Sequence, residues 1–179
     1  LPGMIKEGIF PEGIVKYSPD WDTAMKEYGQ RIREDEELAM RWGDAGPIYG
    51  KQWRRWEYFD HDKGSFVNID QLGKLINGLR KKPTGKKHIV DSWNPGDTPN
   101  MSLPPCHVLY QATANEEGEL ELQLYQRSCD QFLGVPFNIA SYSLLLLMVA
   151  QVVGLKPYEF VHTFGDVHIY SNHIAGAKE

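Results

Sequence analysis

The sequence predicts an α+β fold in which helices pack on a mostly antiparallel or mixed β-sheet. Three stretches indicate this class: an amphipathic stripe over 72–79, strict polar–apolar alternation over 119–124, and an almost wholly apolar run over 143–153. The 179-residue chain has no internal repeat or Pro/Gly/Ser-rich linker and is long enough to bury a sizeable core. We therefore expect residues 1–179 to form a single domain.

Two segments are predicted to be helical. The highly charged stretch 22–42 carries apolar residues at an imperfect helical spacing and predicts one or two surface helices. Asp70 then precedes four apolar residues at helical spacing, Leu72, Leu75, Ile76 and Leu79. Two lysines close this pattern, where positive charge interacts favourably with the helix dipole. A helix over about 71–81 follows.

The second half of the chain contains the predicted strands. Residues 107–114 and 119–124 flank the turn-like sequence NEEGE and predict a β-hairpin. A further strand is expected over 88–93, and two short strands over 160–170, on either side of Gly165 and Asp166. The apolar run through 144–153, which ends before Gly154, predicts a helix buried on nearly every face.

Composition restricts the classes of function. The net charge of -5 gives no general electrostatic reason to expect nucleic-acid binding. The first residues lack the pattern of a signal peptide, and the run 143–153 is shorter than the roughly 20 residues of a membrane-spanning helix. Two widely spaced cysteines, Cys106 and Cys129, suit free thiols in a reducing compartment. A cytoplasmic protein without a membrane segment is predicted.

Cys106 is the candidate nucleophile. It follows Pro104 and Pro105, which restrict the backbone, and it precedes His107. A cysteine attacks as its thiolate, which requires nearby positive charge or hydrogen-bond donors. Taken alone, a cysteine beside a histidine is more often structural than catalytic. Because adjacent residues of an extended segment point to opposite faces, His107 need not act as a base for this thiol.

Cationic and polar groups suggest a ligand with a phosphate and a sugar. Arg127 and Ser128 follow the alternating strand directly, and together suit a phosphate; a surface salt bridge is the alternative. Lys86 and Lys87 form a second cationic pair, although such pairs are usually only solvated. Asp166, His168 and His173 match no common metal spacing, and no metal site is predicted.

Four stretches in fixed order resemble the thymidylate synthase family: GPIYGKQWR (46–54), PPCH (104–107), YQRSCDQFLGVPFNIASY (125–142) and GDVHIYSNH (165–173). The resemblance runs from about Trp42 to His173. It implies reductive methylation of deoxyuridylate (dUMP) to thymidylate (dTMP), with methylenetetrahydrofolate as cosubstrate and dihydrofolate as product. In that chemistry a cysteine thiolate, here Cys106, adds to carbon 6 of the uracil ring.

The resemblance also assigns roles to the matching positions. Tyr49, Asn138 and Asp130 join Cys106 as catalytic residues: Tyr49 assists proton removal from carbon 5 and Asn138 reads the base. The nucleotide phosphate is assigned to Gln126, Arg127 and Ser128, and the sugar hydroxyl to His168 and Tyr170. Asp130 is expected to contact the folate and the nucleotide, with Gly134 permitting close approach of the ligand.

The family forms homodimers in which paired arginines reach the partner's phosphate. Lys86 and Lys87 stand at those positions, keeping the charge but losing the planar fork of arginine. An upstream phosphate loop, a glutamate-bearing helix and a C-terminal tail have no match, so the chain is expected to lack N- and C-terminal family segments. Two alternatives stay open: a hydroxymethylase acting on dUMP or dCMP, and an inactive fragment or pseudoenzyme.

Overall fold

A computed structural model describes residues 2–15 and 18–179 of the chain. Backbone contacts divide it into two compact units. One comprises the residues up to Gly46 together with Asn100–Leu103, and the other comprises Pro47–Pro99 and Pro104–Glu179. A compact unit defined by contacts need not fold independently, so the assignment of residues 1–179 to one domain stays a prediction.

The first unit is helical. It contains α1 (Pro2–Lys6), α2 (Pro19–Glu34) and α3 (Glu36–Trp42). Asp35 separates the last two helices: its backbone N–H closes α2, and its side chain accepts a hydrogen bond from Leu38 N at the start of α3. Ile9, Phe10 and Ala24 form the buried centre of this unit. The predicted helical segment 22–42 is thus two helices.

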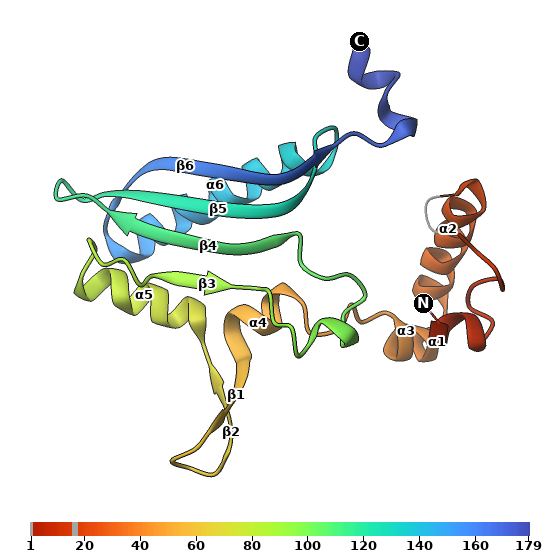
Figure 1. Cartoon of the computed structure of the whole chain (residues 1–179), viewed down its shortest axis with the longest axis horizontal. Coiled ribbons are helices and arrows are strands. Elements are labelled where there is room, and N and C mark those ends of the chain that lie inside the picture. Colours follow the sequence, from red (N-terminus) through yellow and green to blue (C-terminus); the bar gives the residue numbers. More distant parts are fainter. Residues whose placement is uncertain (1, 16–17) are drawn as a thin grey trace. The chain divides into compact units, whose positions relative to one another are not determined.

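The second unit is built on a four-stranded sheet. Its strands are β3 (Ile89–Asp91), β4 (His107–Ala114), β5 (Glu119–Asp130) and β6 (Lys156–His168), in the order β3-β4-β5-β6. The first two pairings are antiparallel and β5 pairs with β6 in parallel. Helix α6 (Gly134–Val153) connects the parallel strands and lies behind them in Figure 1, while α5 (Gln71–Lys81) lies near β3. The predicted α+β fold with a mixed sheet is confirmed.

The core lies between one face of this sheet and the two helices. Alternate residues of β5, namely Leu120, Leu122 and Leu124, are fully buried and pair with β4 across the predicted hairpin. They meet an apolar face of α6 and the inner side of α5, whose buried members are Leu75, Leu79, Tyr142, Leu146, Val149 and Ala150. Polar–apolar alternation in the sequence therefore gives the correct buried face.

The prediction of two short strands over 160–170 is wrong, because β6 is one strand that runs through Gly165. Its parallel pairing with β5 continues past that position, with Ser128 opposite Asp166. A Cβ atom added at Gly165 would lie 2.8 Å from the carbonyl oxygen of Arg127. The glycine therefore permits close approach of two backbones and does not mark a turn.

Helix α6 begins earlier than predicted, at Gly134. Pro136 lies in its first turn, where a proline interrupts no intrahelical hydrogen bond. The helix ends where expected, at Gly154, whose φ of 76° is the left-handed conformation that glycine adopts at little cost.

Burial of α6 on nearly every face is also contradicted. Among the described residues, the sheet and α5 cover only part of the helix, and Leu144, Leu147, Met148 and Val152 are more than half exposed. Of the described helices, α6 alone has the length and composition to cross a membrane. Core helices of soluble proteins share these properties, so this is weak support for a membrane span.

Several shorter elements complete the second unit. Helix α4 (Tyr49–Arg55) leads into a two-stranded hairpin, β1 (Trp56–Asp60) and β2 (Ser65–Ile69), which the sequence analysis did not predict. Helix α5 starts as expected, with the Asp70 side chain accepting a hydrogen bond from Gly73 N. Short 3₁₀ turns lie at Ser171–His173 and Gly176–Lys178, and another, Thr98–Asn100, spans the sequence boundary between the two units.

Candidate active site

Cys106 is held through its backbone by Tyr49. The Cys106 N–H donates to the Tyr49 hydroxyl oxygen at 2.9 Å, and the next N–H, of His107, lies 3.4 Å from the same oxygen. Tyr49 is the first residue of α4, whereas Cys106 immediately precedes β4. Burial raises the pKa of Tyr49, so its hydroxyl remains neutral and its oxygen accepts these bonds.

Arg127 is fixed against the same segment. Its guanidinium donates to the carbonyl oxygens of Pro105 at 2.9 Å and Pro104 at 2.8 Å, and its backbone N–H donates to the Cys106 carbonyl at 2.9 Å. The guanidinium carbon lies 5.3 Å from the centre of the Trp93 ring, within cation–π range. A half-buried positive charge is therefore held beside the segment that carries the thiol.

Asn138 belongs to a chain of polar side chains along the buried side of the sheet. Its Oδ1 accepts a hydrogen bond from Gln126 Nε2 at 2.9 Å, and it also bonds to His107. Gln126 Oε1 lies 2.8 Å from His162 Nε2. Burial lowers the pKa of both His107 and His162 and favours their neutral forms. The chain fixes the orientation of the Asn138 amide.

Gln126 is only 2% exposed, and its amide also donates to the Ser128 carbonyl oxygen at 2.9 Å. All its polar atoms therefore have partners within the protein. This burial does not favour the predicted phosphate contact. It places Gln126 where it can orient Asn138 instead.

Four more residues that were predicted to bind ligands lie at or just beyond the ends of β5 and β6: Ser128, Asp130, His168 and Tyr170. The parallel register sets Ser128 opposite Asp166 and Asp130 opposite His168. The His168 and Tyr170 rings meet edge to face at 5.2 Å, and His168 Nδ1 lies 2.8 Å from Asp166 Oδ1. Predicted phosphate and sugar contacts thus lie at one end of one pair of strands.

Asp130 and Gly134 form the turn that begins α6. The Asp130 carboxylate accepts hydrogen bonds from Phe132 N at 3.1 Å and from Gly134 N at 3.2 Å. Each oxygen therefore retains capacity for another donor. Three large apolar side chains nearby in sequence are exposed: Phe132, Leu133 and Phe137.

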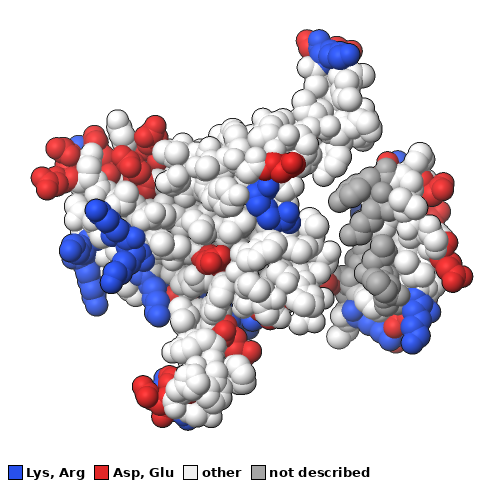
Figure 2. Space-filling view, viewed as in Figure 1, with Lys and Arg blue, Asp and Glu red and all other residues white. Residues whose placement is uncertain are grey.

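Lys86 and Lys87 lie in the exposed loop between α5 and β3. Among residues 2–15 and 18–179, neither ammonium group takes part in an ion pair. Figure 2 shows a gathering of basic side chains at this end of the sheet, next to an acidic group. Basic residues in this part of the chain are Arg80, Lys81, Lys82, Lys86 and Lys87. The structure does not join the two lysines to the Cys106 segment.

The described part of the chain contains no group of three or more His, Cys, Asp or Glu side chains arranged to hold a metal ion. Both cysteines are free, with Cys129 buried and Cys106 half-buried. Burial raises the pKa of the Cys129 thiol and so disfavours its thiolate form.

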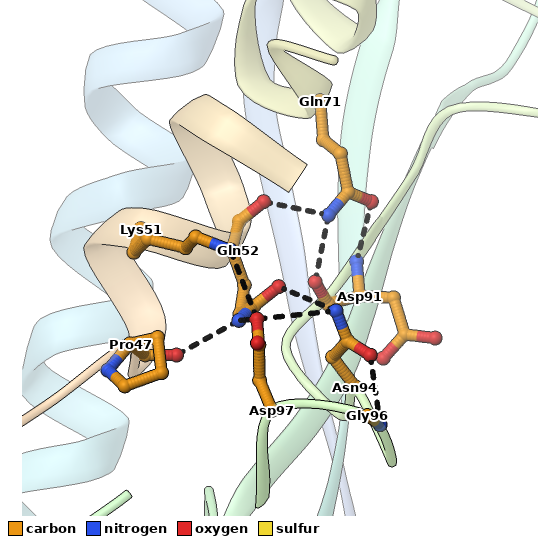
Figure 3. Close-up of polar contacts among 8 residues, drawn as sticks. All are labelled: Pro47, Lys51, Gln52, Gln71, Asp91, Asn94, Gly96 and Asp97. Atoms are coloured by element: carbon orange, nitrogen blue, oxygen red, sulfur yellow. Dashed lines mark hydrogen bonds and ion pairs between the residues drawn. The ribbon is translucent and has the colours of Figure 1, made fainter. Parts of the chain in front are cut away.

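Sequence reasoning missed two contributors to this site: Trp93, which lies under Arg127, and Gln52, one helical turn after Tyr49. Gln52 is fully buried and lies in a polar network that Figure 3 shows. Its place within the GPIYGKQWR stretch was the available signal. A glutamine at a buried helical position requires hydrogen-bond partners, which only the tertiary structure supplies.

The geometry defines a class of site: a half-buried thiol segment, a fixed guanidinium, a neutral tyrosine and an oriented amide, all on one mixed-sheet scaffold. The family model for thymidylate synthase matches residues 16–179. The thymidylate synthase of Mesoplasma florum is 48% identical over 168 residues, which cover 94% of this chain. This chain belongs to the thymidylate synthase family. It spans about half of that relative, since the match covers 55% of the relative's length.

Proposed function

We propose that this chain carries the catalytic site of a thymidylate synthase, which methylates dUMP reductively to dTMP. The supporting observation is the convergence of Tyr49 and Arg127 on the segment of Cys106. A nucleophile held by its backbone, next to a fixed cation, has the arrangement that covalent addition to an electron-poor ring requires.

In the proposed mechanism the Cys106 thiolate adds to carbon 6 of the uracil ring, and carbon 5 becomes nucleophilic. After carbon 5 gains the one-carbon unit, it loses its proton to a water that Tyr49 orders. The bond between the one-carbon unit and the folate nitrogen then breaks and leaves an exocyclic methylene on carbon 5. Hydride transfer from the released tetrahydrofolate to this methylene forms the methyl group, while the thiolate leaves carbon 6 and the ring double bond is restored. Methylenetetrahydrofolate supplies the one-carbon unit and the hydride and leaves as dihydrofolate.

The nucleotide is oriented at three points in this proposal. Arg127 and Ser128 bind the phosphate, and His168 and Tyr170 bind the sugar hydroxyl. Asn138 reads the base, because an amide offers one donor group and one acceptor and can satisfy the uracil imide and carbonyl together. The bond from Gln126 to Asn138 Oδ1 supports this role, since it fixes which way the amide points.

The region around Asp130 suits the folate. A pterin is a flat ring system with several N–H donors, and here a carboxylate with free acceptor capacity lies near exposed apolar side chains. Asp130 would bind the pterin donors, and Gly134 would let the ring approach the start of α6. A carboxylate that accepts hydrogen bonds, together with apolar side chains for the ring, suits such a ligand.

We further propose a cytoplasmic homodimer in which Lys86 and Lys87 reach the partner's phosphate site. Their unpaired ammonium groups support this role, as does the exposure of Tyr125 and Val161 on the sheet. Mixing Cys106→Ala subunits with Lys86→Ala, Lys87→Ala subunits would form hybrid dimers with one complete site. Hybrids that recover no turnover would contradict donation across the interface.

The assay that tests the proposed function follows dihydrofolate formation with dUMP and methylenetetrahydrofolate. We expect Cys106→Ala to abolish turnover while dUMP binding stays measurable. With 5-fluoro-dUMP and the folate, mass spectrometry should find a covalent adduct on the Cys106 peptide. Cys129→Ala is the matched control and should retain this adduct. Absence of an adduct in the unsubstituted protein would overturn the assignment, and product mass distinguishes methylation from hydroxymethylation.

A further inference from the structure

Gln52 lies on the same face of α4 as Tyr49, one helical turn later, and none of its surface is exposed. Its Nε2 donates to the Pro47 carbonyl oxygen at 2.8 Å and to Asp97 Oδ2 at 2.6 Å (Figure 3). Its Oε1 accepts from Asn94 Nδ2 at 3.3 Å. Both N–H groups and the oxygen of this amide are thus in use.

Two of the three partners of Gln52, Asn94 and Asp97, belong to the turn that follows β3. Within that turn, Asn94 Oδ1 accepts from Gly96 N at 3.1 Å, and the Asn94 carbonyl accepts from the N–H groups of Asp97 and Thr98. Hydrogen bonds from Gln52 and then from Lys51 hold the pKa of Asp97 below its usual range. Asp97 is therefore an ionised acceptor at neutral pH, and the turn has one preferred geometry.

A second glutamine ties α4 to the sheet. Gln71 Nε2 donates to the carbonyl oxygens of Gln52 at 2.9 Å and Asp91 at 2.8 Å, and its Oε1 accepts from Asp91 N at 3.0 Å. These bonds are drawn in Figure 3. They join α4, the start of α5 and strand β3 through one side chain.

Helix α4 depends on such contacts for its position. It has only seven residues, and no side chain caps its N-terminus at Ile48. Helices this short are unstable alone, because nucleation costs more than a few hydrogen bonds return. The position of the Tyr49 hydroxyl is therefore set by what holds α4, and the buried amide of Gln52 is the contact nearest to it along the same face.

We propose that Gln52, paired with Asp97, is a positioning residue that keeps the Tyr49 hydroxyl on the backbone of Cys106. Its effect on turnover rests on the proposed thymidylate synthase function; its effect on the Cys106 backbone does not. A leucine could fill a similar volume, so filling space does not explain a fully buried amide with three partners. Directional bonds explain it, because they fix the rotation of α4 about its axis.

The test replaces the donating amide by a carboxylate. Gln52→Glu keeps the shape but sets an acceptor against Asp97 and the Pro47 carbonyl. We expect hydrogen exchange of the Cys106 amide to accelerate at least tenfold, while that of Ala112 in β4 changes less than twofold. In the turnover assay, kcat should fall at least tenfold with the KM for dUMP within twofold, as expected for misplacement of a group that acts after binding.

A charge-swapped pair provides the rescue. Adding Asp97→Asn to Gln52→Glu restores one donor and one acceptor in reversed order. Relative to Gln52→Glu alone, the double variant should show Cys106 exchange at least threefold slower and kcat at least threefold higher. Arg54→Gln is the matched control: it breaks the exposed bond from the same helix to Asp70 and should leave Cys106 exchange within twofold.

Unchanged Cys106 exchange in a folded Gln52→Glu protein would overturn the proposal, as would an equal change in Arg54→Gln. If Gln52→Glu does not fold, Asp97→Ala alone decides, because it removes the acceptor of the Gln52 amide; at least threefold faster Cys106 exchange is expected, and no change would contradict the inference. Failure of the proposed function would instead be seen as absence of turnover in the unsubstituted protein, and the exchange measurements would still stand.

Discussion

Helices α4 and α6 meet the same sheet but are held in place by different forces. Helix α4 is short and is fixed by the side-chain hydrogen bonds of Gln52 and Trp53. Helix α6 is long and packs through apolar side chains such as Leu146 and Val149. Apolar burial is strong but non-directional, whereas hydrogen bonds are weaker and directional. Helix α4, which places Tyr49, is held by directional hydrogen bonds.

Removing a buried apolar side chain should have the largest effect on the free energy of unfolding. Leu124 is fully buried in β5, within the cluster that includes the inner face of α6. Leu124→Ala should lower the free energy of unfolding by about 2–5 kcal/mol, because it removes buried methyl groups and leaves a cavity. Leu144→Ala, at a position 56% exposed on α6, is the control, with a loss below about 1 kcal/mol expected. Equal losses in urea unfolding would show that α6 is not held by its inner face.

Breaking a directional contact of α4 should cost less. Trp53 Nε1 donates to Ser92 Oγ at 2.8 Å, and Ser92 is 1% exposed. Ser92→Ala leaves the indole N–H without its partner, so we expect a loss of about 1–3 kcal/mol in urea unfolding. Ser141→Ala in α6 removes an exposed hydroxyl bonded to the Phe137 carbonyl and should change stability by less than about 0.5 kcal/mol. A larger effect at Ser141 than at Ser92 would reverse the comparison.

The exposed hydrogen bonds between Arg54 in α4 and Asp70, the N-cap of α5, should contribute less to stability than the bond to the buried Ser92. Asp70 caps α5 through Gly73 N at 2.8 Å and receives two bonds from Arg54, at 2.9 Å each. Asp70→Ala should lower stability by about 1 kcal/mol, mainly through loss of the cap. The Gly73 N–H, and then Arg54, hold the pKa of Asp70 below its ordinary value, so this contribution is present at neutral pH and lost as pH falls through that lowered pKa.

Two measurements check this attribution. The difference in thermal transition between Asp70→Ala and the unsubstituted protein should shrink in acid, below pH 4. Asp62→Ala, at an exposed position in the β1–β2 turn, should show no such difference. A difference for Asp70 that persists unchanged at low pH would rule out the charged cap as its cause.

The smallest expected effect concerns His107, whose ring lies 5.3 Å from that of Tyr49 in α4 and 5.1 Å from that of Tyr142 in α6. Burial lowers its pKa below the ordinary value of 6.5. The unfolded chain then binds more protons below that pH, so stability should decline as pH falls from 7 to 5. His107→Gln should reduce this slope without abolishing it, since His162 shifts in the same direction. An identical slope in the variant would exclude His107 as a contributor.

The elements of the fold that were predicted correctly are those that short stretches of sequence determine. The hairpin of β4 and β5, the Asp70 cap and the glycine that ends α6 are each encoded within a few residues. The continuity of β6 through Gly165 was mispredicted, because its cause is a backbone far away in sequence. The exposed side of α6 was mispredicted for a related reason: composition shows that a helix is apolar, not which neighbours cover it.

In the candidate site, too, residues within motifs were predicted, whereas contacts that depend on the tertiary structure were not. Cys106, Arg127 and Asn138 stand in motifs whose residues could be matched one by one, and the structure links Cys106 to Arg127 and Asn138 to Gln126. Burial of Gln126 and the bond between His162 and Gln126 depend on strand register and were not foreseeable from spacing. Gln52 was passed over because a single polar residue in a helix has no periodic signature.

The parallel pairing of β5 and β6 also orders events in time. Asp130 and His168 are neighbours in the sheet but lie on either side of the whole of α6 in sequence, so a growing chain completes Cys106 and Arg127 well before His168 exists. Contacts that close such long loops form late in folding, because the entropy of closure must be overcome first. A chain halted during synthesis before Lys156 would therefore carry the residues proposed for the phosphate and the base without those proposed for the sugar, so the sugar contact would form later than the other two.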